Sequence, residues 1–430
     1  MAIRWALGFV CVGSVSVLAY MAAAWQPAIP PVDPPAAASF APALVNKGKV
    51  LASAARCMDC HTTKGGQPGA GGRPFARLFG TIYSSNITPD AETGIGNWSL
   101  DAFARALRDG VARDGKHLFA TALPVDHFTQ LTDEDIGALY AYLMNLPPVK
   151  AQTPSNRVPF PFYIRSLQAT WKAIYLAPGP YQPDATRDAQ WNRGAYLAEA
   201  VAHCSSCHTP RNVLGAEEAG HPYGGALVDG WWASPLDVAA SPQPWTRAQL
   251  VDYLRTGESV PHGVALEPMQ KVVQSLRGLP DSDIEALAAY FTSFITYAHD
   301  QKAGIARATA PLAPRDDNER YGAQRYLEFC SSCHEKRGAM TSMARSPIGL
   351  SAAVWAEKPE NYIRIVLDGI TRDGIAPGPT MPGFREKLTD NDIAMIAGYL
   401  RVSRTTLLTW PWDGLLVSIQ RLRAPAASSP

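Results

Sequence analysis

Residues 192–208 read NRGAYLAEAVAHCSSCH, a helical pattern that runs directly into a Cys-x-x-Cys-His motif. The same arrangement occurs twice more, at 46–61 and at 320–334. Six of the seven cysteines of the chain belong to these motifs, so no set of cysteines is left for a disulfide framework. The repetition predicts that the chain is built from one repeated unit. The motif residues are Cys57, Cys60 and His61; Cys204, Cys207 and His208; and Cys330, Cys333 and His334.

The spacing of these residues is typical of covalent haem attachment. Two thiols three positions apart can each form a thioether with one vinyl group, and the adjacent imidazole then reaches the iron. A structural zinc site also uses Cys-x-x-Cys pairs, but it needs four ligands, and each pair here would have to borrow two. A redox-active dithiol needs a βαβ context, which this sequence does not show. The motifs therefore predict three covalently bound haem c groups.

The segments around each motif repeat as well. A middle helix is predicted at 98–110 and 245–257, with a weaker third copy at 359–369, and Ser99 and Thr246 suit its N-cap. A terminal helix with the pattern D-I-x-x-[LI]-x-[AG]-Y-[LF] closes each unit. A glycine stands eight to ten residues before the first cysteine of each motif. A small residue there lets another helix approach closely, and we expect this to be the terminal helix.

These repeats predict an all-α fold of three tandem cytochrome c-like domains, each with one covalently bound haem, behind an N-terminal membrane helix. Residues 5–25 carry no charge and are long enough to cross the hydrocarbon layer once, although a cleaved signal peptide is the alternative interpretation. The predicted divisions are an anchor or signal segment (1–25), a Pro/Ala-rich linker (26–39), domain 1 (40–150), a linker (151–187), domain 2 (188–300), a linker (301–315), domain 3 (316–405) and an amphipathic tail (406–430).

The sixth iron ligand is predicted from the loops that precede the terminal helices. Met381, in GPTMPGF, lies on a Pro/Gly-rich loop before the third terminal helix, and Met269 is the methionine available in the second unit. A methionine opposite histidine raises the haem potential, whereas a second histidine lowers it. In the first unit Leu123 takes the corresponding place and cannot bind iron. His127, four residues further on, is the predicted ligand there, with His117 or an open site as alternatives.

Two residues after the second motif are candidates for supporting roles. The Pro210 carbonyl could accept a hydrogen bond from Nδ1–H of His208 and fix the imidazole tautomer. Arg211 could pair with a haem propionate, or it could be a solvated loop charge. The C-terminal tail could lie in a membrane interface, or it could pack on the haem domains or on the partner. Lys+Arg 39 against Asp+Glu 38 leaves no basic excess for a nucleic-acid partner.

The chain resembles the membrane-bound triheme cytochrome c subunits of bacterial periplasmic dehydrogenase complexes. The resemblance rests on the three motifs, on SSNITPDAETGIGNWSLDAFARALRDGVARDGKHL (84–118), on CHTPRNVLGAEE (207–218) and on the LTDEDI-type helix starts. It covers the chain from about Trp25 to Arg404. It implies an electron-transfer subunit that takes electrons from a catalytic partner and passes them to membrane ubiquinone or an oxidase.

The resemblance also bears on the partner. The segment ALPVDHF, where alcohol and sugar dehydrogenase branches usually have Met-Pro, is more similar to the molybdenum-hydroxylase branch, which acts on aldehydes or N-heterocycles with a molybdopterin subunit and a 2Fe-2S subunit. Quinoprotein alcohol dehydrogenases and flavin-dependent gluconate or sugar dehydrogenases are the alternatives. The implied location is the periplasmic face of the cytoplasmic membrane, in contact with lipid. A multihaem peroxidase or oxidase with an open first haem is the competing enzyme class, but no carboxylate or Arg constellation supports peroxide cleavage.

Overall fold

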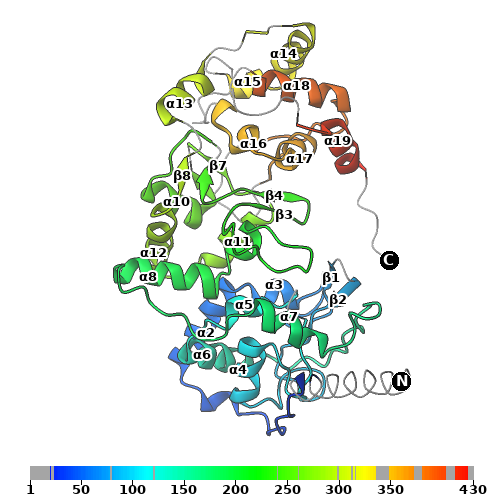
Figure 1. Ribbon diagram of the computed structural model, residues 1–430, viewed down its shortest axis with the longest axis vertical. Coiled ribbons are helices and arrows are strands. Elements are labelled where there is room, and N and C mark those ends of the chain that lie inside the picture. The colour runs from blue at the N-terminus through cyan, green and yellow to red at the C-terminus, as the bar shows by residue number, and fades with distance from the viewer. Residues whose placement is uncertain are drawn as a thin grey trace, which may run out of the picture. The chain divides into compact units, whose positions relative to one another are not determined.

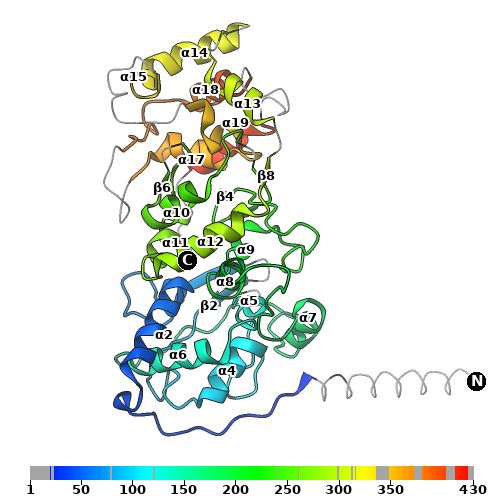
Figure 2. The same ribbon diagram turned by 90° about the vertical axis from the view of Figure 1, so that its left-hand side faces the viewer.

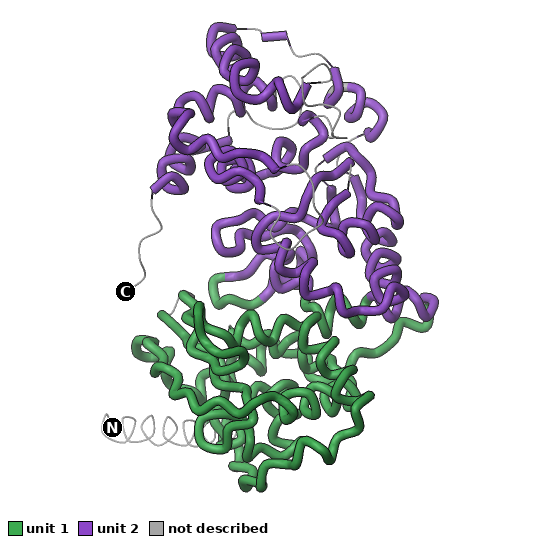
Figure 3. Tube along the Cα trace, turned by 180° about the vertical axis from the view of Figure 1, so that it is seen from behind, with its two compact units in different colours: residues 1–186, 195–203, 213–216 green, residues 187–194, 204–212, 217–430 purple. Residues whose placement is uncertain are grey.

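The chain forms two compact units, each of which is described by itself (Figure 3). The first comprises residues 1–186, 195–203 and 213–216, and the second comprises 187–194, 204–212 and 217–430. The computed structural model describes residues 20, 24–77, 80–119, 122–239, 241–259, 261–297, 300–310, 313–314, 316–335, 348–371, 380–402 and 412–424.

The first unit is mainly helical, with one short ribbon of two strands (Figure 1). Helices α2 and α6 pack side by side at its centre. Its elements are η1 (Ala37–Ser39), α2 (Pro42–Ala54), α3 (Cys57–His61), β1 (Pro74–Arg77), β2 (Gly80–Tyr83), α4 (Leu100–Asp109), α5 (Val125–Phe128), α6 (Asp133–Met144), α7 (Leu167–Tyr175) and the π-helical turn η2 (Leu197–Val201).

The second unit contains the other two motifs. It begins with α8 (Ala189–Tyr196), although the last two residues of this helix belong to the first unit. The other elements are α9 (Ser205–His208), β3 (Ala226–Val228), β4 (Trp231–Ala233), β5 (Val238–Ala239), α10 (Arg247–Thr256), β6 (Glu258–Ser259), β7 (Gly263–Val264), α11 (Met269–Leu276), α12 (Asp281–Thr292), β8 (Thr296–Tyr297), α13 (Gln301–Thr309), α14 (Asp317–Phe329), α15 (Ser331–His334), η3 (Ile348–Leu350), α16 (Ala352–Trp355), α17 (Glu360–Asp368), α18 (Asp390–Val402) and α19 (Leu415–Arg423).

The predicted close crossing of opening and terminal helices is confirmed in all three copies. A Cβ atom on Gly48 of α2 would lie 1.8 Å from the carbonyl oxygen of Ala138 in α6. A Cβ on Gly322 of α14 would lie 2.2 Å from the carbonyl oxygen of Met395 in α18. Gly194 of α8 meets α12 in the same way. Only glycine permits these backbones to approach so closely.

The predicted helix ends are confirmed as well. Ser99 accepts a hydrogen bond from the backbone N–H of Ala102 at the start of α4, and Thr246 forms a full capping box with Gln249 at the start of α10. Gly110 ends α4 in the left-handed conformation. These caps fix where the helices begin and end, and so position the loops that follow them.

The prediction of an all-α fold with three separate domains is wrong. The described residues include eight short strands, paired as four two-stranded sheets. The chain forms two compact units, and the opening helix of the middle copy is divided between them, with 187–194 in one and 195–203 in the other. The strands have two to four residues, which is too short to show a period-two pattern in the sequence.

The predicted N-terminal membrane helix lies almost entirely outside the described residues. Of residues 1–25, the structure describes only Tyr20, Ala24 and Trp25. In the described part of the chain no helix is both long and apolar enough to cross a membrane. The prediction of an N-terminal membrane helix is therefore not supported.

The C-terminal helix α19 packs against the third copy of the repeat. Trp412, Leu415 and Ile419 are buried in a cluster with residues of α14, α17 and α18. The described part of the predicted tail thus packs on the cytochrome fold, which was one of the two interpretations of its sequence.

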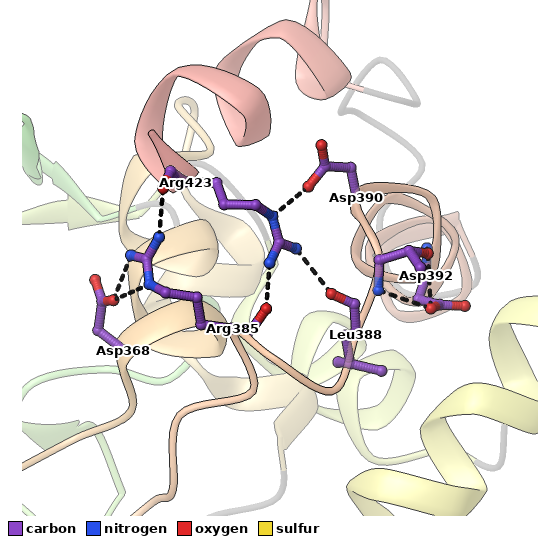
Figure 4. A network of polar contacts seen from close by, with 7 residues as sticks. Asp368, Arg385, Leu388, Asp390, Asp392 and Arg423 are labelled. Carbon is purple, nitrogen blue, oxygen red and sulfur yellow. Dashed lines mark hydrogen bonds and ion pairs between the residues drawn. The ribbon is translucent and has the colours of Figure 1, made fainter. Parts of the chain in front are cut away.

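A polar network holds the end of α19 in place (Figure 4). The Arg423 guanidinium donates to Asp390 at 2.6 Å, to the Leu388 carbonyl and to the Arg385 carbonyl. Arg385 in turn donates to Asp368 at 2.5 Å and to the Arg423 carbonyl at 2.8 Å. The two arginines therefore connect the ends of α17, α18 and α19.

Candidate haem-binding sites

The first motif forms the short helix α3, directly after a sharp turn at the end of α2. Arg56 adopts the left-handed conformation, with φ 57°, and its guanidinium contacts Asp59 at 2.9 Å. This turn separates the long opening helix from the helical turn that carries both cysteines and His61. None of the six motif cysteines forms a disulfide.

The second motif is arranged in the same way. His203, with φ 41°, takes the place of Arg56 and turns the chain before Cys204. The helical turn α9 then carries Cys207 and His208. The third motif differs locally, because α14 runs up to Phe329 and Cys330 follows with φ −121°. In all three copies a single helical turn displays the Cys-x-x-Cys-His residues.

Two short strand ribbons orient the motif histidines. Nδ1–H of His61 donates to the Ser85 carbonyl at 2.7 Å, just beyond β2. Nδ1–H of His208 donates to the Ser234 carbonyl at 2.7 Å, just beyond β4. In each case the bond to Nδ1 makes Nε2 the nitrogen that can bind iron. Burial lowers the pKa of both imidazoles, which favours the neutral form that ligates a metal.

Pro210 does not have the predicted role. The acceptor for His208 is Ser234, and the Pro210 carbonyl accepts a hydrogen bond from the backbone N–H of Glu218 at 2.8 Å. Pro210 follows the motif too closely for its carbonyl to turn back to the imidazole, whereas the β3–β4 ribbon returns the chain to it. Arg211 contacts the Ser206 carbonyl at 3.0 Å and Glu217 at 3.5 Å. Its role toward a propionate stays a prediction.

These observations fit covalently attached haem. Burial raises the pKa of the Cys57 thiol to about 12 and that of Cys330 to about 11, so both thiols are uncharged near neutral pH in these surroundings. The two cysteines of each motif would hold a haem covalently, and the histidine of that motif would bind its iron. His334 stands at the equivalent place in α15.

The sixth-ligand candidates lie in the same units as their partner histidines. His127 is in the first unit with His61, whereas Met269 and Met381 are in the second unit with His208 and His334. The predicted pairs are therefore compatible with the fold. That these residues bind iron stays a prediction.

His127 has the geometry of a positioned metal ligand. It lies in α5, with 4% of its surface exposed, and Nδ1–H donates to the Glu199 carbonyl at 2.6 Å. Such a bond fixes both the tautomer and the ring orientation, so that Nε2 would be the nitrogen available to a metal. The alternative, His117, is held differently: its Nε2–H donates to the Ala24 carbonyl at 2.7 Å. His117 therefore has a structural partner for the nitrogen most often used in ligation.

The two methionines are placed on different elements. Met381 pairs with Ile370 in a backbone bridge that closes the preceding loop, and it packs on the same core cluster as Cys330. Met269 is the first residue of α11, directly after a cis Glu267–Pro268 peptide bond. Both side chains are half-buried.

Sequence reasoning missed His203. Its ring centre lies 6.1 Å from that of His127 and 5.7 Å from that of Phe128, and its Nε2 lies 3.2 Å from the Ala55 carbonyl. Burial and the neighbouring His127 lower the pKa of His203 to about 4. The motif that begins at Cys204 carries a strong spacing signal, whereas a lone histidine before it carries none.

Two segments match family models of cytochromes. Residues 45–147 match the cytochrome c family, and residues 317–400 match a family described as cytochrome c oxidase, cbb3-type, subunit III. Two matches in place of three correct the predicted count of cytochrome c domains. The middle copy differs from the other two in its opening helix, which is divided between the two compact units.

Several dehydrogenase subunits are similar over most of this chain. A nicotinate dehydrogenase subunit of Pseudomonas putida is 41% identical over 94% of the chain, which spans only 34% of that relative's length. The gluconate 2-dehydrogenase cytochrome c subunit of Pantoea cypripedii is 38% identical, over 84% of this chain and 86% of the relative. The fructose dehydrogenase cytochrome subunit of Gluconobacter japonicus is 36% identical, over 86% and 81%.

The matches to the gluconate and fructose relatives cover more than four fifths of both chains. Together with the cytochrome c family match, this similarity implies covalently bound haem c and a catalytic dehydrogenase as partner. The chain belongs to the cytochrome c electron-transfer subunits of dehydrogenase complexes.

Proposed function

We propose that the chain holds three haem c groups, one at each Cys-x-x-Cys-His motif, and passes electrons from a molybdenum hydroxylase to ubiquinone or an oxidase. The observation that carries the haem count is the repeated local geometry. Each motif is displayed on one helical turn, and in the first two copies the histidine is oriented by a backbone carbonyl at 2.7 Å. When bound, haem c supplies reversible one-electron oxidation and reduction.

We propose that a protein side chain provides the sixth ligand of each iron. His127 would complete the first site, Met269 the second and Met381 the third. A six-coordinate iron exchanges electrons with little rearrangement and offers no open position for a substrate. This arrangement favours electron transfer over the peroxidase or oxidase alternative. The first site, with two histidines, would have the lowest potential of the three.

Two observations support the molybdenum-hydroxylase partner. The 41% identity to the nicotinate dehydrogenase relative covers 94% of this chain, and the name of that relative gives an N-heterocycle as its substrate. The segment ALPVDHF also resembles that branch, in which a molybdopterin subunit and a 2Fe-2S subunit oxidise aldehydes or N-heterocycles. We place the complex at the periplasmic face of the cytoplasmic membrane.

Affinity purification from the native host tests this partner. We expect the tagged chain to co-purify with molybdenum and iron–sulfur clusters, and we expect an aldehyde or nicotinate to reduce its haems in that preparation. Gluconate and ethanol serve as comparison substrates. Co-purification with a flavin or quinone cofactor, and haem reduction by gluconate or ethanol alone, would assign the chain to the other dehydrogenase branches.

A second assay separates the electron carrier from an enzyme. The reduced protein is exposed to carbon monoxide, and its visible spectrum is followed. We expect little change in the spectrum, because each iron would already have a protein side chain as its sixth ligand. Rapid binding of one carbon monoxide per chain would show an open haem and would favour a peroxidase or oxidase.

A further inference from the structure

The linker segment 158–183 turns its charged residues inward. It contains only two charged residues, Arg165 and Lys172. Lys172 is 8% exposed, and its Nζ donates to the carbonyl oxygens at the end of α4, including that of Gly110 at 3.1 Å. The Arg165 guanidinium lies 4.0 Å from the ring centre of Phe119. Both cations therefore interact with the body of the first unit.

The opposite face of this segment is apolar and exposed. On α7, Leu167 and Ile174 lie two turns apart, and they are 36% and 63% exposed. Phe160 and Tyr163, just before the helix, form an edge-to-face pair and are 72% and 56% exposed. Figure 2 shows α7 at the outer edge of the first unit, away from α2 and α6. This pattern is the reverse of a helix that packs its apolar side on a core.

A neighbouring loop extends the same apolar area. Nε1–H of Trp171 donates to the Leu214 carbonyl at 3.0 Å, which brings residues 213 and 214 beside α7. Val213 is 81% exposed and Leu214 is 42% exposed. We call this area the α7 surface; it comprises Phe160, Tyr163, Leu167, Ile174, Val213 and Leu214.

The α7 surface also adjoins the end of the uncharged N-terminal stretch. The Tyr20 hydroxyl donates to the Ser166 carbonyl at 2.6 Å, and the Thr170 hydroxyl donates to Tyr20 at 3.1 Å. Tyr20 belongs to residues 5–25, which contain no charged residue, and Trp25 at the end of this stretch is 68% exposed. Tyr20 of this uncharged stretch therefore contacts the α7 segment directly, although the two are about 150 residues apart in the sequence.

We propose that the α7 surface lies in the boundary between headgroups and acyl chains of a lipid bilayer. A protein partner is normally met by an apolar centre with a polar and charged rim, but residues 158–183 offer no exposed charge. Aromatic side chains with one polar atom, such as Tyr163, are enriched where lipid meets water. Burial of exposed apolar area then supplies the free energy of binding. The proposal does not depend on haem content or on the identity of the dehydrogenase.

Hydrogen–deuterium exchange of the full chain tests the location of this contact. The protein is measured alone and with vesicles of phosphatidylcholine and phosphatidylglycerol. We expect exchange in peptides covering 160–176 to slow several-fold with vesicles, and exchange in peptides covering 415–423 to stay unchanged. The control helix α19 also carries exposed apolar residues, Leu416 and Val417.

Three outcomes of this measurement would overturn the proposal. The first is a lack of vesicle binding by the full chain. The second is vesicle binding without slower exchange in 160–176. The third is slower exchange there only when the dehydrogenase subunits are added in place of vesicles, which would identify a protein-docking surface.

A matched pair of variants tests the energetic contribution. In one, Leu167→Asp is combined with Ile174→Asp; in the other, Leu327→Asp is combined with Val417→Asp, at positions 60% and 68% exposed. We expect at least about ten-fold weaker vesicle partitioning for the first pair only, because each aspartate removes one buried aliphatic side chain from the lipid contact. Equal partitioning of both variants, with unchanged far-UV circular dichroism, would refute the assignment.

Discussion

Gly194 and Ala286 bring the opening and terminal helices of the middle copy into backbone contact. A Cβ atom on Gly194 would lie 2.0 Å from the Ala286 carbonyl oxygen and 2.9 Å from Cβ of Tyr290. Gly48 and Gly322 hold the same place in the other copies. The repeated unit is thus defined by a helix crossing that excludes any side chain at one position, even where the surrounding elements differ.

Substitution of Gly48 by alanine is expected to destabilise the first unit. The added methyl group would overlap the backbone of α6, and overpacking of this kind costs about 1–3 kcal/mol. The free energy of unfolding in urea measures the effect.

Gly137→Ala is the matched control for this substitution. Gly137 lies in α6 beside Ala138, yet a Cβ atom there would meet nothing within 4 Å. Alanine in an open helical position stabilises by about 0.5–1 kcal/mol. Equal effects of the two substitutions, or a stable Gly48→Ala variant, would show that the crossing does not need glycine.

The buried cation of α7 predicts a dependence of stability on pH. Burial lowers the pKa of Lys172 from 10.5 to about 8, although nearby Asp109 opposes this. Between these two values the unfolded chain binds more protons than the folded chain at this residue, so its contribution to stability increases as pH rises. We expect the melting temperature of the wild type, relative to Lys172→Met, to increase from pH 8 to pH 10. A constant or falling difference would contradict the lowered pKa.

His127→Ala is expected to convert one haem from low spin to high spin, because the first iron would lose its sixth ligand. Electron paramagnetic resonance of the oxidised protein counts low-spin centres directly. His117→Gln is the control, since His117 is held by Ala24 in the structure. An unchanged low-spin count in His127→Ala, or a loss in His117→Gln, would remove His127 from the site.

Met269→Leu and Met381→Leu are each expected to lower the potential of one haem, or to leave its iron five-coordinate. A thioether ligand stabilises the reduced iron, so that its removal shifts the potential downward. Spectroscopic redox titration resolves the three steps. Met144→Leu, at a methionine buried in α6, should leave all three potentials unchanged. Wild-type potentials in both ligand variants would exclude these methionines.

The sequence predicted the helix crossings and caps because their signals are local. A glycine before each motif, an Asp-Ile start and a tyrosine on the terminal helix recur at fixed spacing, and Ser99 and Thr246 stand directly before helical runs. Each of these features depends on residues within one or two helical turns. It can therefore be recognised in the sequence without knowledge of the tertiary fold.

Other features depended on parts of the chain that return from a distance. Pro210 lies two residues after His208 in the sequence, but the β3–β4 ribbon brings the Ser234 carbonyl to the imidazole in its place. The inward direction of Lys172 could not be predicted, because its carbonyl partners lie more than 60 residues earlier. The division of the middle opening helix between two units likewise arises from packing. The helical periodicity of the sequence does not indicate it.

The count of covalently attached haems tests the central claim most directly. Mass spectrometry of the purified, denatured chain, expressed with a haem-attachment system, should give the polypeptide mass plus three haem groups. Variants in which Cys57, Cys204 or Cys330 and the second cysteine of that motif become alanine should each lose one group. A mature chain with fewer than three added groups, or with none, would contradict the account of three haem sites in one electron-transfer subunit.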